Sequence, residues 1–249
     1  MSFSKVLSIV FIASLFGLSG LLGKEGKILL VVTNHHELGE TGNETGYFLS
    51  EVAHPWKVFT DAGFEVVFAS PDGGFAPMDP KSFDLGDPVN RSFWETLDAV
   101  EGVASTHPLS EINPVEYAAI FFAGGHGTMW DFPADPEIDR VTRGIYENGG
   151  TVGAVCHGPA ALVDVQLSDG SYLVDGRKVG GFTNAEEEAV GLTQAVPFLL
   201  ETRLEERGGQ FVGGNNFEEN VVVDGRIVTG QNPASAEKTA EEIVAILKD

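Results

Sequence analysis

The sequence predicts an α/β protein built around a mainly parallel sheet. Residues 27–33 and 65–70 are short apolar runs that fit buried strands, and a helical pattern over residues 47–62 separates them. A strand, a helix and a strand in this order form a βαβ unit with parallel strands and a right-handed crossover. Two further apolar runs, 117–122 and 152–155, each lead into a glycine-rich turn. Parallel strands bring such turns to one edge of a sheet, where α/β proteins place their sites.

The remaining elements follow from turn and helix signals. Residues 71–114 are rich in Asp-Pro and Gly-Gly turn signals and predict one short helix, over residues 92–100. So long an irregular insertion in a compact domain is typical of a lid or a binding surface. A helix over residues 136–148 leads into the strand 152–155.

The C-terminal third predicts two hairpins and two helices. Residues 172–180 and 220–229 each carry Asp-Gly between apolar runs, which is a strong signal for a β-hairpin. A helix is expected over residues 197–207, between the hairpins. Residues 233–247 form an amphipathic pattern, which predicts a last helix that packs on the sheet.

The charge of the chain excludes one class of function. The 249 residues carry a formal charge of −22, and their 15 Lys and Arg residues are scattered among 37 acidic residues. This field repels nucleic acids and anionic membrane surfaces, so we expect neither as a partner. With 43% hydrophobic residues the chain can bury a full core, and we expect a single domain over residues 24–249.

The N-terminus predicts export. In residues 1–23 a charged Lys5 precedes an apolar run that ends in small residues, which is the pattern of a secretory signal peptide. The alternative is an uncleaved membrane anchor, because the run is almost long enough to span a bilayer. After cleavage we expect no association with a membrane. In an oxidising compartment a lone cysteine is either buried and inert or kept for chemistry.

That lone cysteine, Cys156, stands where a strand turns directly into a helix. The strand 152–155 precedes it, and Gly158-Pro159 opens the predicted helix. A side chain at such a nucleophile elbow projects into the open, and the positive end of the following helix favours a thiolate. This context favours a reactive cysteine over an inert one.

Three further groups could serve this thiol. Backbone N–H groups of Gly124, Gly125 and His126 could stabilise an oxyanion near Cys156, although a tight turn that needs glycine explains the same pattern. His157 follows the cysteine directly and could move protons. Glu51 could also move protons near the thiol, because it falls on an otherwise apolar side of the first helix. The alternative interpretation of Glu51 is an ordinary glutamate that faces solvent.

Four motifs in this order resemble the ThiJ/PfpI superfamily, and most closely its heat-shock chaperone and glyoxalase III branch. They are Thr45-Gly-Tyr-Phe-Leu-Ser-Glu-Val-Ala-His-Pro55, Phe122-Ala-Gly-Gly-His-Gly-Thr128, Ala154-Val-Cys-His-Gly-Pro-Ala-Ala-Leu162 and Thr229-Gly-Gln-Asn-Pro-Ala-Ser235. The resemblance implies a flavodoxin-like three-layer sandwich that is usually dimeric and is related to class I glutamine amidotransferases. It also implies that Cys156 is the nucleophile, Glu51 the acid beside it and His157 its neighbour.

One position departs from the family pattern. Some members of this branch complete a Cys-His-Asp triad with an aspartate where this chain has Asn184. Asparagine can orient an imidazole but cannot stabilise an imidazolium with a full charge, which makes peptidase activity doubtful. We expect the nearby residues 186–188, all glutamates, to be solvated. His35 and His36 lack a second ligand cluster with metal-like spacing, so we expect no metal site.

The resemblance and the elbow cysteine together predict a cofactor-free enzyme for small reactive aldehydes, with methylglyoxal to lactate as the model reaction. Cys156 would form a thiohemiacetal, and Glu51 would move a proton between the substrate carbons. We expect a small carbonyl substrate and a homodimer. The alternatives are an exported cysteine amidase or peptidase, and a stress-response holdase or redox sensor. An exported enzyme would not meet aldehydes that are made in the cytosol, so the predicted location conflicts with the predicted substrate.

Overall fold

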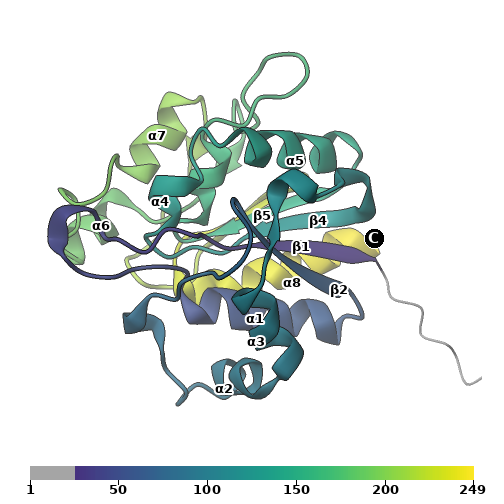
Figure 1. The fold of residues 1–249 in the computed structure, drawn as a ribbon. Coiled ribbons are helices and arrows are strands. Elements are labelled where there is room, and N and C mark those ends of the chain that lie inside the picture. Colours follow the sequence, from purple (N-terminus) through teal and green to yellow (C-terminus); the bar gives the residue numbers. More distant parts are fainter. Residues whose placement is uncertain (1–25) are drawn as a thin grey trace, which may run out of the picture.

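The computed structural model describes residues 26–249 and has the predicted architecture of three layers (Figure 1). Its central sheet has the strand order β3-β2-β1-β4-β5-β9-β8, and all neighbouring strands are parallel except β8 and β9. In that order the strands are His107–Pro108, Glu65–Ser70, Lys27–Val31, Tyr117–Phe122, Thr151–Val155, Ile227–Gly230 and Val221–Asp224. The prediction of a flavodoxin-like α/β fold is confirmed.

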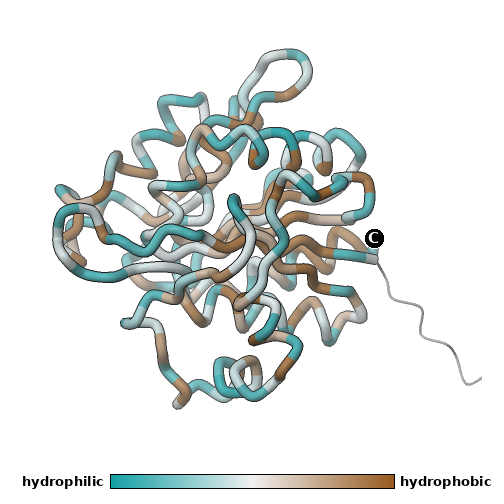
Figure 2. Tube along the Cα trace, in the orientation of Figure 1, coloured by the Kyte–Doolittle hydropathy of each residue, from teal (hydrophilic) through white to brown (hydrophobic). Residues whose placement is uncertain are grey.

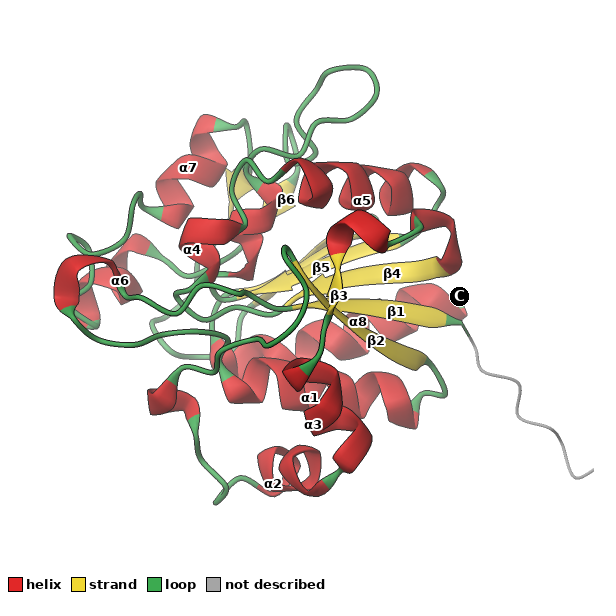
Figure 3. Cartoon of the chain, in the orientation of Figure 1, coloured by secondary structure: helices red, strands yellow, loops and turns green. Residues whose placement is uncertain are grey.

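Helices cover both faces of this sheet (Figure 3). One face carries α1 (Leu49–Asp61) and α8 (Ala236–Lys248), which pack on each other and on the strands, with α2 (Pro88–Glu95) outside them. The other face carries α5 (Pro136–Glu147), against β4 and β5. The shorter helices are α3 (Leu97–Ala104), α4 (Thr128–Asp131), α6 (Asn184–Ala189) and α7 (Leu200–Glu206).

The core lies on the two central strands. Every residue from Ile28 to Val31 is buried, and so are the last four residues of β4. Figure 2 shows hydrophobic residues concentrated along these strands. Strands with helices on both faces have no solvent side, so they appear in the sequence as continuous apolar runs. Their carboxyl ends meet at the edge of the sheet that holds the glycine-rich turns.

The insertion over residues 71–114 is more regular than predicted. It forms two helices, α2 and α3, in place of one short helix. Asp87 caps α2 by accepting hydrogen bonds from the amides of Val89 and Asn90, at 2.7 and 3.2 Å. Phe93 of α2 is buried edge-to-face against Trp56 of α1. The segment therefore packs over α1, and the apolar face of α2 accounts for its order.

One predicted hairpin is confirmed and the other is wrong. Strands β8 and β9 pair antiparallel across Gly225, whose φ is +60°. A turn also forms at Gly176, where the Arg177 amide donates to the Val174 carbonyl at 3.0 Å. However, β6 (Lys178–Val179) pairs in parallel with β7 (Gln210–Phe211) and not with the residues before the turn. Those residues include Val174, which is buried in the core instead.

Candidate active site

Cys156 occupies the predicted elbow at the end of β5. Its φ is +59°, a left-handed conformation that is uncommon for a residue other than glycine. Its amide donates to the Gly230 carbonyl at 3.0 Å, and its carbonyl accepts from the Phe182 amide at 2.8 Å. The predicted helix after it is a short 3-10 helix of five residues, Gly158–Leu162. The predicted contribution of a helix dipole to a thiolate is therefore small.

His157 faces the cysteine with one ring nitrogen and a carboxylate with the other. Its Nδ1 lies 3.3 Å from Cys156 Sγ, and its Nε2 lies 2.8 Å from Glu187 Oε2. An ionised carboxylate only accepts hydrogen bonds, so Nε2 carries the proton and Nδ1 presents its lone pair to the thiol. The three side chains thus form a Cys-His-Glu arrangement.

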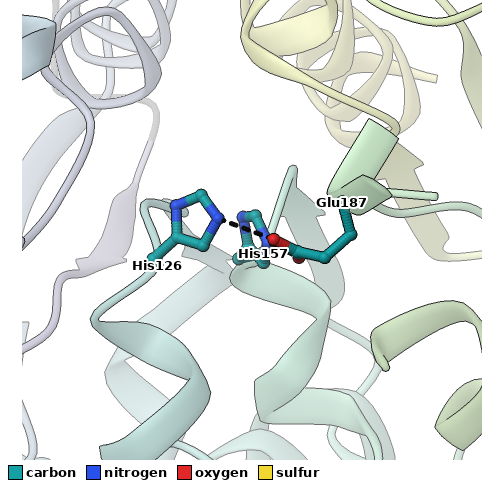
Figure 4. Close-up of side chains that lie close together, drawn as sticks. All are labelled: His126, His157 and Glu187. Atoms are coloured by element: carbon teal, nitrogen blue, oxygen red, sulfur yellow. Dashed lines mark hydrogen bonds and ion pairs between the residues drawn. The ribbon is translucent and has the colours of Figure 1, made fainter. Parts of the chain in front are cut away.

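Glu187 binds a second histidine at the same time (Figure 4). His126 Nε2 lies 3.1 Å from Glu187 Oε1, and the centroids of the His126 and His157 rings are 4.0 Å apart. Burial works to raise the pKa of Glu187, but the hydrogen bonds from His126 and His157 outweigh it and lower the pKa to about 2. Glu187 is therefore ionised at neutral pH.

His157 is neutral in this environment. Burial lowers its pKa to about 4, and the charge of His126 acts in the same direction, against the opposing effect of Glu187. A neutral imidazole with its lone pair toward Sγ can accept the proton of a thiol. The geometry thus allows His157 to act as a base toward Cys156.

Glu51 is buried on the other side of the thiol. Its Oε2 accepts a hydrogen bond from the Gly124 amide at 2.8 Å, while its Oε1 has no hydrogen-bond partner among residues 26–249. Burial raises the pKa of Glu51 to about 8, although the Cys156 thiol and the Gly124 amide partly lower it. Glu51 is therefore not the solvated helix residue that was the alternative. At neutral pH its carboxyl is mostly protonated, so it can donate a proton and, once ionised, can accept one.

The thiol and the carboxyl both hold their protons at rest. Burial raises the pKa of Cys156 well above its usual value, and the charge of Glu51, when ionised, raises it further. A hydrogen bond from the His157 amide works in the opposite direction. Ionisation of the thiol therefore requires a proton acceptor, and His157 Nδ1 lies within reach at 3.3 Å from Sγ.

Only two of the three backbone amides predicted to stabilise an oxyanion are free to donate a hydrogen bond. The Gly124 amide is not available as predicted, because it donates to Glu51. The amides of Gly125 and His126 make no hydrogen bond within the described residues, and both residues line the cavity beside Cys156. Glycine is required here by close approach: a Cβ at Gly124 would lie 2.5 Å from Glu51 Oε2, and one at Gly125 would lie 2.1 Å from the Gly46 carbonyl oxygen.

Asn184 does not meet His157. Its side-chain amide donates to Thr202 Oγ1 at 2.9 Å, and its backbone amide donates to Glu201. The carboxylate that orients His157 is Glu187, three residues further along the chain.

The prediction that residues 186–188 are solvated is wrong for two of the three. Glu186 and Glu187 are buried, and only Glu188 is exposed. Thr183 and Glu186 form a capping box at the start of α6, and Glu186 also accepts from the Phe217 amide at 2.8 Å. The pattern Thr-x-x-Glu is visible in the sequence and could have placed a helix start here. That Glu187 reaches His157 depends on how α6 packs, which no local pattern encodes.

A cavity opens beside the thiol. It has a volume of about 240 Å³ and an apolar majority in its lining, which consists of Leu38, Phe48, Asp79, Lys81, Gly125, His126, Cys156, His157, Phe182, Val190, Leu192, Phe217 and Pro233. Cys156 and His157 form one part of its wall. A small substrate in this cavity would contact the nucleophile directly.

One set of donors has the spacing of a metal site. Ligand atoms of His126, His157 and Glu187 lie within 4.8 Å of one another, and in residues 26–249 no other such group of three is found. The hydrogen bonds between them account for this spacing. His35 is outside this group and stacks on Trp130.

Comparison with known proteins decides the family. Residues 44–246 match the model of the DJ-1/PfpI family. The chain belongs to the DJ-1/PfpI family. This match confirms the resemblance to the ThiJ/PfpI superfamily, and the glyoxalase relatives of the chain confirm its glyoxalase III branch.

Several relatives carry glyoxalase names. The chain is 33% identical to "Glyoxalase 3" of Candida albicans, over 88% of this chain and 97% of that protein. It is 32% identical to "Glutathione-independent glyoxalase HSP31" of Saccharomyces cerevisiae, over 90% and 98%. The crystal structure of glyoxalase III from Candida albicans superposes with a TM-score of 0.83 at 30% identity, covering 90% of this chain and 98% of the other.

These relatives contradict the predicted export and its alternative, a membrane anchor. The match itself argues against export, because the chain aligns with proteins named as glyoxalases along nearly their full length. Residues 1–23, on which that prediction was based, lie outside the described residues. Across residues 26–249 no helix is both long enough and apolar enough to cross a membrane.

Proposed function

We propose that this protein is a glutathione-independent glyoxalase that converts methylglyoxal and water to lactate with its own side chains. The names of its relatives support the reaction, and the surroundings of Cys156 support the mechanism. One observation carries the assignment. Cys156 Sγ lies 3.3 Å from His157 Nδ1, and the buried carboxyl of Glu51, whose pKa the thiol lowers, has an Oε1 without a hydrogen-bond partner among residues 26–249.

The reaction begins with addition of the thiol to the aldehyde carbon. An S–C1 bond forms, His157 Nδ1 takes the thiol proton, and the protonated Glu51 donates its proton to the aldehyde oxygen. Free amides at Gly125 and His126 are placed to stabilise negative charge on that oxygen as it develops. The product is a thiohemiacetal and an ionised Glu51.

The second stage moves a proton between the substrate carbons. Glu51 removes the C1 proton, His157 protonates the C2 oxygen, and an enediol results. Glu51 then returns its proton to C2, and the C1 hydroxyl proton passes to His157, which leaves a lactoyl thioester on Cys156. Water cleaves the S–C1 bond, releases lactate and restores the thiol and the protonated carboxyl. No oxidant or reductant is consumed.

Turnover of methylglyoxal without glutathione tests this function. Lactate formation is measured with purified wild-type protein and with Cys156→Ala. We expect the variant to form lactate at the rate of the buffer alone. Wild-type turnover that persists in Cys156→Ala would exclude the mechanism.

The Cys-His-Glu arrangement also suits acyl transfer, so amidase or peptidase activity is the second candidate. Release of product from amide or peptide substrates separates it from the glyoxalase. A holdase role is separated by suppression of client aggregation that survives Cys156→Ala. Homodimerisation stays a prediction, which sedimentation equilibrium can test.

A further inference from the structure

The cavity beside Cys156 is larger than methylglyoxal requires. Methylglyoxal has three carbon and two oxygen atoms, whereas the cavity has a volume of about 240 Å³. An apolar protein cavity of ~150 Å³ is large enough to hold benzene. There is therefore room for a benzene ring in addition to the two reacting carbons.

Aromatic side chains line this extra space in a fixed order from the nucleophile outward. The Phe182 ring lies next to the His157 ring, with centroids 4.4 Å apart, and the Phe217 ring follows 6.3 Å beyond Phe182. Phe182 is tied to the nucleophile, because its amide donates to the Cys156 carbonyl at 2.8 Å. An aromatic group attached to a carbon near Sγ would lie against these rings at the spacing that aromatic pairs prefer.

Phe217 is held at the cavity in a costly conformation. Its φ is +61°, which is an outlier for a bulky residue and persists only where the surroundings enforce it. The enforcing contact is the buried Glu186, whose Oε1 accepts from the Phe217 amide at 2.8 Å and from Asn232 Nδ2 at 2.9 Å. Phe217 is nevertheless 50% exposed, so it gains little by burial within the protein itself. Its free apolar face borders the cavity and is available to a ligand.

We infer that the substrates of this site are 2-oxoaldehydes with an aromatic or bulky apolar group, and that Phe217 determines this specificity. The inference rests on the proposed function. The aldehyde carbon takes the position beside Sγ, and the apolar group lies between Phe182 and Phe217. With phenylglyoxal the S–C1 bond forms, the C1 proton moves to C2, and water cleaves the thioester to give mandelate. Phenylglyoxal plus water equals mandelic acid, so no further reactant is needed.

Steady-state kinetics with two substrates test this inference. Mandelate from phenylglyoxal and lactate from methylglyoxal are quantified by chromatography, with Cys156→Ala as the blank for uncatalysed reaction and for arginine modification by phenylglyoxal. We expect kcat/KM to be at least ~10-fold higher for phenylglyoxal, since apolar groups in a fitting pocket discriminate by about this factor or more.

Phe217→Ala is the decisive variant. It should lower the ratio of the two kcat/KM values by ~10-fold, and Phe217→Leu should lower it less. A change in the ratio cancels the different intrinsic reactivities of the two aldehydes. The matched control is Phe83→Ala, which removes a phenylalanine of similar exposure, 46%, that does not line the cavity. The control should keep the wild-type ratio, and circular dichroism and thermal melting verify that each variant is folded.

Two failures can be told apart. Cys156-dependent lactate formation without a preference for phenylglyoxal, or a preference that Phe217→Ala leaves unchanged, overturns the inference but not the proposed function. Absence of both mandelate and lactate overturns the proposed function and the inference with it.

Discussion

Replacement of Glu187 by glutamine tests the base at the centre of the site. Glu187 accepts two hydrogen bonds, from His157 at 2.8 Å and from His126 at 3.1 Å. Glutamine has the same shape but offers one acceptor and one donor, so it cannot accept from both rings. If its amide nitrogen faces His157 Nε2, the imidazole proton moves to Nδ1, and this nitrogen no longer accepts the thiol proton. We expect kcat/KM to fall by ~10² to 10⁴, or about 3–5 kcal/mol of transition-state stabilisation.

The same change has an effect on stability with a defined sign. The pKa of Glu187 is lowered from 4.5 to about 2, so its charge contributes stability above pH 4.5 that is lost as the pH falls toward 2, and this amounts to roughly 3 kcal/mol at most. The difference in unfolding free energy between wild type and Glu187→Gln should therefore narrow below pH 4.5.

The assays for Glu187→Gln are lactate formation and urea unfolding, with Glu188→Gln, an exposed neighbour, as the control. A Glu187→Gln protein with kcat/KM within ~3-fold of wild type, about 0.6 kcal/mol, would refute the role assigned to Glu187.

Three further variants extend the test. Glu51→Gln should lose activity by at least ~10². At pH 8 it should also unfold at a higher temperature than wild type, because the pKa of Glu51 is raised to about 8 and the wild type therefore loses stability as the pH rises from 4.5. A difference in melting temperature between the two proteins that does not grow with pH would contradict this. Gly124→Ala should lower activity and should lower stability by about 1–3 kcal/mol, because its Cβ would lie 2.5 Å from Glu51 Oε2. Gly213→Ala is the control in the same assays, because a Cβ at Gly213 meets nothing closer than 3.4 Å. Asn184→Ala should keep kcat/KM within ~2-fold, because its side chain binds Thr202 and not His157; a larger loss would restore it to the site.

Much of the fold follows from local patterns. Strands over residues 65–70 and 117–122 have the predicted bounds, because a buried parallel strand appears as an apolar run between turn residues. The hairpin at Gly176 could not be predicted correctly, since the turn forms while the residues before it are buried elsewhere. The insertion was predicted to hold one helix over residues 92–100, but it holds two helices of eight residues each, which meet at Thr96. Contact with α1 orders the first of them, and local sequence patterns do not encode that contact.

The site was predictable to the extent that its residues lie near a backbone signal. Cys156 and His157 follow a strand, and Glu51 lies on an apolar helix face. Glu187 lacks such a signal, because its role depends on the packing of α6 against two histidines that are 61 and 30 residues away. The hydrogen bond from the Gly124 amide to Glu51 could not be predicted either, because only the fold brings these two residues together.

Carbon-13 NMR of a stalled reaction tests the central claim most directly. Methylglyoxal labelled at the aldehyde carbon is mixed with Glu51→Gln. In this variant Cys156 can still add to the aldehyde, because His157 can pass the thiol proton on to the aldehyde oxygen, but the C1 proton has no carboxylate to accept it. The mechanism predicts a thiohemiacetal carbon resonance that accumulates on this variant and is absent from the double variant that also carries Cys156→Ala. No such resonance, or the same resonance without the cysteine, would contradict covalent catalysis by Cys156 with Glu51 as the proton shuttle.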